Sequence, residues 1–222
     1  MAETRKEVED ITAQTGMAPA EYLYSIRLSD RNVIAAHSVW LNPQEIALYA
    51  QTRTSIAHCP KSNLKLASGI ADTETYTKAG INVSIGTDGT ASNNTLDMVE
   101  EMRFAALLPK GTRYNPEAVN ARTALRMATI NGAKALGIHH LTGSLEVGKR
   151  ADLIVIHADA SNMLPIYDVY SAIVYASNSK NIRSSMVNGK WIMRNRELVY
   201  INKTETMEFM KHIVNSQTDN QK

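Results

Sequence analysis

The sequence predicts an α/β fold in which parallel strands are joined by helices, followed by a smaller antiparallel sheet. Short apolar runs at residues 32–37, 55–59 and 82–87 are strand-like, and helical patterns lie between them. This alternation of strands and helices is typical of a parallel sheet built from crossover connections. Near Gly143 the pattern changes, and strand-like runs follow one another without long helices. With 222 residues, the chain can bury one sizeable core and carry an appendage.

The segment after the first apolar run carries the residues that begin a helix. Asn42 is suited to cap the helix, and Pro43 fits its first position. Glu45 can reach back to the cap residue and complete a capping box. These residues predict a helix that runs to about Ala50.

Two further helices are expected in the first part of the chain. Residues 72–79 form one of them, and Gly80 can take the left-handed conformation that ends a helix. The other is predicted over residues 95–108, with its caps in residues 92–94. Its apolar residues lie roughly on one face: Leu96, Val99 and Met102.

The second part of the chain reads as a small antiparallel sheet. Residues 152–157 predict a buried strand that follows a glycine-bracketed turn at 143–148. Asn188-Gly189 stands between two apolar runs, which is the strongest short signal for a β-hairpin. Residues 203–214 predict a final helix with a polar end.

Composition and charge exclude several classes of function. Hydrophobic residues make up 44% of the chain and charged residues 21%, which is typical of a globular protein. The net charge of +2 provides no basic stripe for nucleic acid or an anionic membrane. No apolar run approaches the ~20 residues that cross a bilayer, and the charged N-terminus does not resemble a signal peptide. The single cysteine, Cys59, cannot form an internal disulfide, so we expect a cytoplasmic protein.

Three ionisable side chains stand where predicted strands end. His37 and His58 close the first two apolar runs, and Asp88 follows the third in a Gly-Thr-Asp-Gly turn. Reactive groups of α/β proteins gather at this carboxyl edge of the sheet. A carboxylate presented from a tight turn suits a metal ion or a proton relay with a histidine. Two alternatives stay open: structural histidines, and Asp88 as a helix N-cap.

The segment after His58 is expected to be a polar loop that begins at Pro60. Ser62 and Asn63 in this loop can bind a ligand or satisfy the loop's own backbone, and spacing does not separate these alternatives. A thiol nucleophile at Cys59 is disfavoured because neighbouring strand residues point to opposite faces. No phosphate-binding glycine loop and no His-Glu-x-x-His motif occurs, so the residues alone indicate a hydrolytic or metal-assisted site.

Five motifs, taken in order, resemble a known superfamily: AAHSVWL, IAHCPKSNLKLASG, GTDGTASNNTLDM, NGAKALG and GSLEVGKRADLIVI. They are similar to motifs of the amidohydrolase superfamily. Within that superfamily, they most resemble the 5-methylthioadenosine/S-adenosylhomocysteine deaminases and their chlorohydrolase relatives. The resemblance implies that residues 1–140 form the C-terminal half of a metal-dependent (β/α)8 barrel, with strands six to eight. It further implies a partial small β-sandwich at 141–202, and a helix and tail at 203–222.

The resemblance also implies a site and a reaction. Asp88 would be a ligand of one divalent ion, most naturally zinc, and His37 would polarise the attacking water. Glu3 would form a hydrogen bond with the purine ring and shuttle a proton, while His58, Ser62 and Asn63 would shape the substrate pocket. The implied reaction is hydrolytic deamination of an adenosine-type nucleoside, in which the ion lowers the pKa of water from ~15.7 towards ~7.

The chain departs from the family pattern in one large respect. The family's His-x-His is absent, and a histidine three residues before Glu3 would precede Met1. One of four metal ligands is present, whereas zinc sites use three or four protein ligands. We therefore expect the C-terminal half of a longer enzyme, from a truncated gene model, an internal start or a split gene. This half should need its N-terminal counterpart, or a homo-oligomer, for activity.

Two other functional readings remain. The chain could be a catalytically inactive fragment or assembly partner, or an amidohydrolase that acts on guanine, a cytosine-like ring or a chlorotriazine. Smaller departures also occur, because Arg27 and Arg53 stand where the family pattern leads us to expect glycine.

Overall fold

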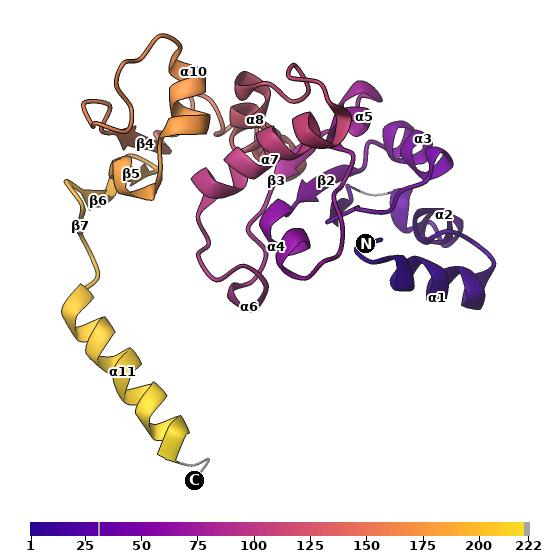
Figure 1. Cartoon of the computed structure of the whole chain (residues 1–222), viewed down its shortest axis with the longest axis horizontal. Coiled ribbons are helices and arrows are strands. Elements are labelled where there is room, and N and C mark those ends of the chain that lie inside the picture. Colours follow the sequence, from indigo (N-terminus) through magenta and orange to yellow (C-terminus); the bar gives the residue numbers. More distant parts are fainter. Residues whose placement is uncertain (31, 220–222) are drawn as a thin grey trace.

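The first part of the molecule is built around a short parallel sheet. The structure is a computed structural model that describes residues 1–30 and 32–219. Its first three strands are β1 (Ile34–Ala36), β2 (Ser55–His58) and β3 (Val83–Ile85). They lie parallel in the order β1-β2-β3, which confirms the three predicted strands and their crossover connections (Figure 1).

Helices connect these strands and flank the sheet (Figure 1). They are α1 (Arg5–Thr15), α2 (Pro19–Ser25), η1 (Leu28–Asp30), α3 (Pro43–Thr52), α4 (Pro60–Lys65), α5 (Thr73–Lys78), α6 (Thr90–Asn93), α7 (Met98–Arg113), α8 (Ala121–Met127) and α9 (Ile130–Ala135). The predicted capping box of α3 is confirmed, because Glu45 N donates to Asn42 Oδ1 at 2.8 Å and Asn42 N donates to Glu45 Oε2 at 2.9 Å. Helix α5 lies within the predicted range 72–79, and Gly80 is left-handed.

Two expectations for this part were wrong. The helix expected at 95–108 begins at Met98, since Asp97 Oδ1 accepts the first backbone amides and residues 92–94 do not cap it. Leu96 lies before the helix and is 48% exposed, so it does not share a buried face with Val99 and Met102. The expected polar loop is the short helix α4, because Pro60 occupies the first helical position, where a missing N–H is tolerated.

The core of this part lies between the sheet and its helices. Ile56 and Val83 of the sheet are fully buried together with Tyr76 of α5, Met102 of α7 and Met127 of α8. Side chains of this size each contribute ~1.5–3 kcal/mol when removed from water. The packing therefore fixes the carboxyl edge of the sheet, on which the candidate site stands.

The second part is a four-stranded antiparallel sheet in the order β4-β5-β6-β7. Its strands and short helical turns are β4 (Leu153–Ile156), α10 (Val169–Ser171), η2 (Ala172–Ala176), η3 (Ser179–Asn181), β5 (Ile182–Val187), β6 (Lys190–Arg194) and β7 (Glu197–Leu198). The predicted hairpin is confirmed, since Asn188 and Gly189 both have positive φ between β5 and β6. The strand expected at 152–157 is present as β4, but the expectation that it is buried was wrong, because Ile154 is 54% and Val155 39% exposed.

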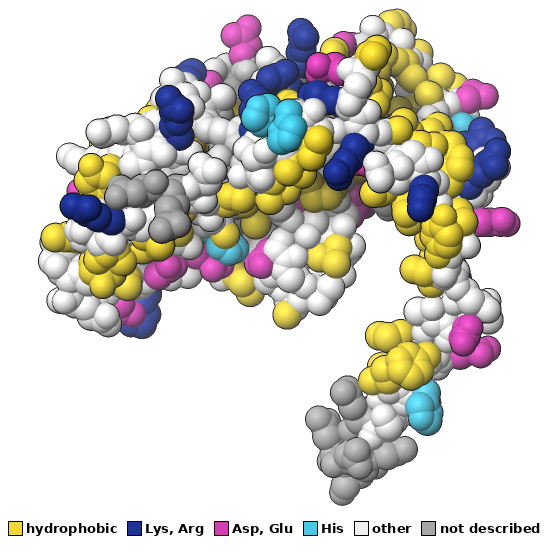
Figure 2. Space-filling model, turned by 180° about the vertical axis from the view of Figure 1, so that it is seen from behind, with side chains coloured by type: hydrophobic (Ala, Val, Ile, Leu, Met, Phe, Trp, Pro, Cys, Tyr) yellow, Lys and Arg dark blue, Asp and Glu magenta, His cyan; other side chains and the backbone are white. Residues whose placement is uncertain are grey.

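Helix α11 (Lys203–Asp219) extends from this sheet as an arm that stands away from the body (Figure 1). It covers the predicted range 203–214 and continues beyond it. Apolar side chains are exposed along the arm and the segment before it (Figure 2), namely Tyr200, Ile201, Met207, Phe209 and Met210. Among the residues that the structure describes, no helix has the length and apolar character of a membrane span.

Candidate active site

The parallel sheet places three of the predicted site residues at its carboxyl edge. His58 is the last residue of β2, His37 directly follows β1, and Asp88 lies just beyond β3. His37 and Asp88 are both left-handed, with φ of 62° and 60°. Such backbone conformations cost free energy in residues other than glycine and cluster at functional sites. The strand ends thus present two strained, ionisable residues on one side.

Helix α4 connects these two residues through adjacent side chains. Ser62 Oγ donates to Asp88 Oδ2 at 2.7 Å, and Asn63 Oδ1 lies 2.8 Å from His37 Nδ1. Both Ser62 and Asn63 are buried, so packing fixes the positions from which they make these contacts. Because an amide oxygen accepts, this contact assigns a proton to His37 Nδ1, and in the neutral ring Nε2 is then the acceptor nitrogen. Ser62 and Asn63 therefore hold the carboxylate and the imidazole in fixed positions.

Glu3 lies on the other side of His37. Its Oε2 is 3.7 Å from His37 Nε2, and its Oε1 accepts a hydrogen bond from Ser68 Oγ at 2.9 Å. The backbone around Ala2 brings it there, since Val39 N and Trp40 N both donate to the Ala2 carbonyl at 3.0 Å. Glu3 is thus within reach of the imidazole.

The Asp88 carboxylate is strongly acidic. Hydrogen bonds from Ser92 and Ser62 lower the pKa of Asp88 to about 2, although partial burial opposes the shift. The proximity of His37 adds to this effect. The alternative reading of Asp88 as a helix N-cap is wrong, because Gly89 occupies that position in α6 and Ser62 belongs to a different helix. The carboxylate is therefore ionised at neutral pH and aimed at α4.

His58 and Cys59 are buried below the edge of the sheet and are uncharged at neutral pH. Complete burial lowers the pKa of His58 to about 4, with a further contribution from His37. Burial raises the pKa of Cys59 to about 12, so its thiol is a poor nucleophile. Within the described residues, His58 Nδ1 and Asn63 Nδ2 are buried without a hydrogen-bond partner. Such orphaned groups are costly unless a ligand or water satisfies them.

Sequence reasoning did not find Ser68, which orients the Glu3 carboxylate. It lies 65 residues from Glu3 in the chain, and a lone serine carries no motif. Only the folding of the first residues against the segment after β1 brings the two together.

The described residues do not form a complete metal site. Across residues 1–30 and 32–219, no group of three or more His, Cys, Asp and Glu side chains could hold a metal ion. Asp88 has the chemistry of one ligand, since it is ionised and oxygen-donating. Zinc requires three or four protein ligands, so this donor set alone does not fit it.

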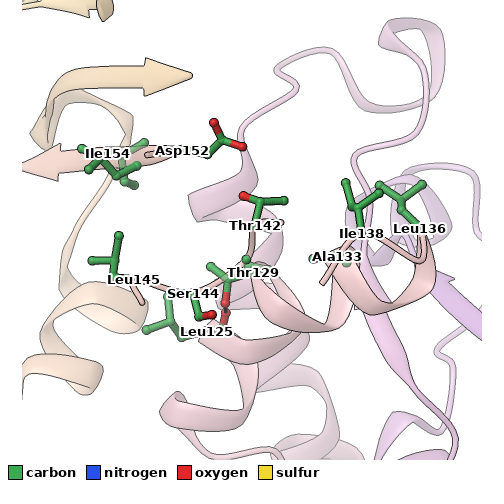
Figure 3. A pocket seen from close by; sticks show the side chains of 14 residues that line it. Leu125, Thr129, Ala133, Leu136, Ile138, Thr142, Ser144, Leu145, Asp152 and Ile154 are labelled. Atoms are coloured by element: carbon green, nitrogen blue, oxygen red, sulfur yellow. Dashed lines mark hydrogen bonds between the residues drawn. The ribbon is translucent and has the colours of Figure 1, made fainter. Parts of the chain in front are cut away.

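A cavity lies away from these residues, between α8, α9 and β4 (Figure 3). It has a volume of about 560 Å³ and a mostly apolar lining, which includes Leu125, Ala133, Ile138 and Leu145. Asp152 is the one acidic side chain among its lining residues. This composition indicates packing space, whereas the polar residues of the candidate site lie at the edge of the parallel sheet.

Residues 1–192 match the amidohydrolase family, and this match covers the parallel sheet and strands β4 and β5 of the antiparallel sheet. The chain belongs to the amidohydrolase family. A 5-methylthioadenosine/S-adenosylhomocysteine deaminase from Moorella thermoacetica is 48% identical over 89% of this chain and 46% of its own length. A 5'-deoxyadenosine deaminase from Methanosphaera stadtmanae is 42% identical over 93% of this chain and 48% of its own length.

Solved amidohydrolases share the fold of this chain. An adenosine deaminase from Xanthomonas campestris, with bound zinc, superposes with a TM-score of 0.95 at 38% identity. The superposition covers 97% of this chain and 49% of that one. This amidohydrolase chain therefore spans about half the length of the curated relatives and the solved structure that it matches.

Proposed function

We propose that the chain supplies the C-terminal half of a metal-dependent hydrolase that deaminates adenosine-type nucleosides. The substrates would be 5-methylthioadenosine and S-adenosylhomocysteine, and the products an inosyl compound and ammonia. One observation carries the proposal: adjacent residues of α4 hold the Asp88 carboxylate and the His37 imidazole together at the carboxyl edge of the parallel sheet. The identity to deaminases of this substrate class supports it.

In this proposal the two sheets are parts of a larger architecture. Strands β1, β2 and β3 are the sixth to eighth strands of a (β/α)8 barrel whose half comprises residues 1–140. Residues 141–202 contribute part of a small β-sandwich, and the segment from 203 onward forms the terminal helix and tail, of which 220–222 lie outside the described residues. A three-stranded sheet cannot close into a barrel, which needs about eight strands at this diameter.

Asp88 is proposed as one ligand of a single divalent ion, with zinc favoured by the ion in the X. campestris structure. The remaining ligands would come from polypeptide outside this chain. Such an ion, if held by Asp88 and ligands from outside this chain, would supply water acidic enough to act as a nucleophile at neutral pH. The low pKa of Asp88 keeps its carboxylate available as a ligand at that pH.

The roles of the other residues follow from their contacts. His37 Nε2 is the free acceptor of its ring, so it is placed to take a proton from the attacking water. Glu3, 3.7 Å away, is placed to pass a proton to a ring nitrogen of the substrate. The unpartnered His58 Nδ1 and Asn63 Nδ2 provide buried polar groups that a purine nucleoside can satisfy.

The proposed catalytic unit needs a second half. Two features support this need: the apolar cavity between α9 and β4, and the exposed apolar side chains of the α11 arm. Large exposed apolar surfaces mark interaction sites. Solved relatives of twice the length contain further chain that can cover them, so we favour the complementary half of the fold over a homo-oligomer. A non-catalytic assembly role would use the same surfaces, and turnover separates the two readings.

The test is reconstitution of activity. The chain is co-expressed with the N-terminal half of the M. thermoacetica deaminase, and ammonia release from 5-methylthioadenosine is measured beside the chain alone. We expect turnover from the pair, none from the chain alone, and none from a pair carrying Asp88→Ala. A stable, zinc-loaded pair without turnover on 5-methylthioadenosine, S-adenosylhomocysteine or adenosine would overturn the proposed activity. Turnover of guanine or a chlorotriazine instead would reassign the substrate.

A further inference from the structure

A buried carboxylate lies behind the candidate site and has no role in the proposed reaction. Glu101 of α7 is fully buried, with 0% of its surface exposed. A carboxylate is expensive to remove from water unless hydrogen bonds compensate it. Its neighbour Glu100 faces the surface and pairs with the Lys61 ammonium, so the two glutamates on one helix have different environments.

Each oxygen of Glu101 accepts a hydrogen bond from a different segment of the site. Oε2 accepts from the backbone N–H of Lys61 at 3.1 Å. This amide lies in the first turn of α4, where backbone donors have no partner within the helix. Oε1 accepts from Asn93 Nδ2 at 2.5 Å. One side chain therefore joins α4 to α6.

The two branches lead directly to the site residues. Asn93 Nδ2 also donates to the carbonyl oxygen of Thr87 at 2.5 Å, and Thr87 immediately precedes Asp88. On the other branch, Lys61 immediately precedes Ser62 and Asn63. Those two residues hold Asp88 and His37.

We propose that Glu101 is a positioning residue, which clamps α4 and the turn before Asp88 so that the Asp88 carboxylate and the His37 imidazole keep their mutual geometry. Both partners of Glu101 are donors, so only a side chain with two acceptor oxygens at this length satisfies them together. A glutamine places an NH2 group against one of the two donors. The clamp rests on the proposed function for its catalytic meaning, whereas its geometry is testable without turnover.

The test compares Glu101→Gln with Glu100→Gln, which makes the same change one residue earlier on α7 and removes the negative charge that pairs with the Lys61 ammonium. Hydrogen exchange of the backbone amides at 61–63 and 88–94 is measured in the chain by NMR, at matched global stability. We expect about tenfold faster exchange in both segments for Glu101→Gln and little change for Glu100→Gln. Unchanged exchange in Glu101→Gln would overturn the clamp.

The catalytic consequence is measured in the reconstituted pair. Glu101→Gln should lower kcat at least about tenfold while KM changes little, because the substrate contacts remain and the reacting groups are misplaced. An unchanged kcat, or an effect confined to KM, would overturn the positioning role. If a stable, zinc-loaded wild-type pair shows no turnover, the proposed function fails, and hydrogen exchange still decides the clamp.

A second variant guards against misfolding. Asn93→Ala removes the hydrogen bonds of Asn93 to Thr87, Glu101 and Thr95 but leaves the contact between Glu101 and the Lys61 amide, so exchange should rise at 88–94 and stay unchanged at 61–63. Equal opening of both segments in Asn93→Ala would show that the branches are not separate, and would contradict the clamp.

Discussion

The turn that carries His37 depends on one buried hydroxyl group. Tyr76 of α5 is 1% exposed, and its hydroxyl donates to the Ser38 carbonyl at 2.9 Å. Ser38 is fully buried and, like His37 before it, is left-handed, with φ of 52°. Tyr76→Phe keeps the ring and removes only the donor, so it isolates the contribution of this hydrogen bond to the turn.

The expected loss of stability follows from that geometry. A net protein hydrogen bond contributes ~0.5–1.5 kcal/mol, and a buried carbonyl left without a donor costs ~1–3 kcal/mol. We therefore expect a fall of about 1–2 kcal/mol in the free energy of unfolding. For a chain of this length, the corresponding fall in Tm is roughly 3–6 °C.

Urea denaturation followed by circular dichroism measures this change. Tyr114→Phe is the matched control, since Tyr114 is 95% exposed and should show no difference. A loss below about 0.5 kcal/mol in Tyr76→Phe would refute the reasoning, because the Ser38 carbonyl would then be satisfied in another way.

Three further variants or treatments test other parts of the account. Arg53 ends α3 in the left-handed conformation, with φ of 57°, which glycine adopts at lower cost than other residues. Arg53→Gly should therefore stabilise the chain by about 0.5–1 kcal/mol in urea denaturation, whereas Arg53→Ala should give no gain. A gain with alanine would refute backbone strain as the cause. Burial raises the pKa of Asp72, but hydrogen bonds from Arg113 and Thr75 outweigh it and hold the pKa below 3.8. Arg113→Met should therefore cost less than about 1 kcal/mol at pH 7, and the loss should shrink as the pH falls through the lowered pKa of Asp72, where the carboxyl becomes protonated in the folded state as well. A loss independent of pH would exclude the ion pair as its source. Cys59 should resist iodoacetamide at pH 8 until the chain is unfolded, as mass spectrometry can follow; rapid labelling of the native chain would contradict its raised pKa.

Local signals made much of the fold predictable. The Asn42 and Glu45 capping box, the Asn188-Gly189 hairpin and the three apolar strand runs each depend on residues close in sequence, and each is present in the structure. The positions of His37, His58 and Asp88 at one edge also followed, because parallel strands end on the same side. The sequence also suggested a special backbone at Arg53, because glycine was expected there, and Arg53 has the left-handed conformation that glycine usually adopts.

Features that depend on distant contacts were not predictable in this way. Ile154 is exposed although it lies in a hydrophobic run, because burial of a strand depends on which elements pack against it. The hydrophobic run alone does not reveal this. Ser68 and Glu101 reach the site only through the tertiary fold, from 65 and 40 residues away from their partners Glu3 and Lys61. Polar residues in such positions carry no periodicity, so sequence patterns do not distinguish them from surface residues.

Zinc content tests the central claim most directly. The chain is purified alone and as a pair with the complementary half of the fold, both are dialysed against buffer containing trace zinc, and bound metal is measured by mass spectrometry. The account predicts no retained zinc in the chain alone and one equivalent in the pair, lost with Asp88→Ala. One equivalent of zinc retained by the chain alone, or retained by the pair after Asp88→Ala, would contradict it.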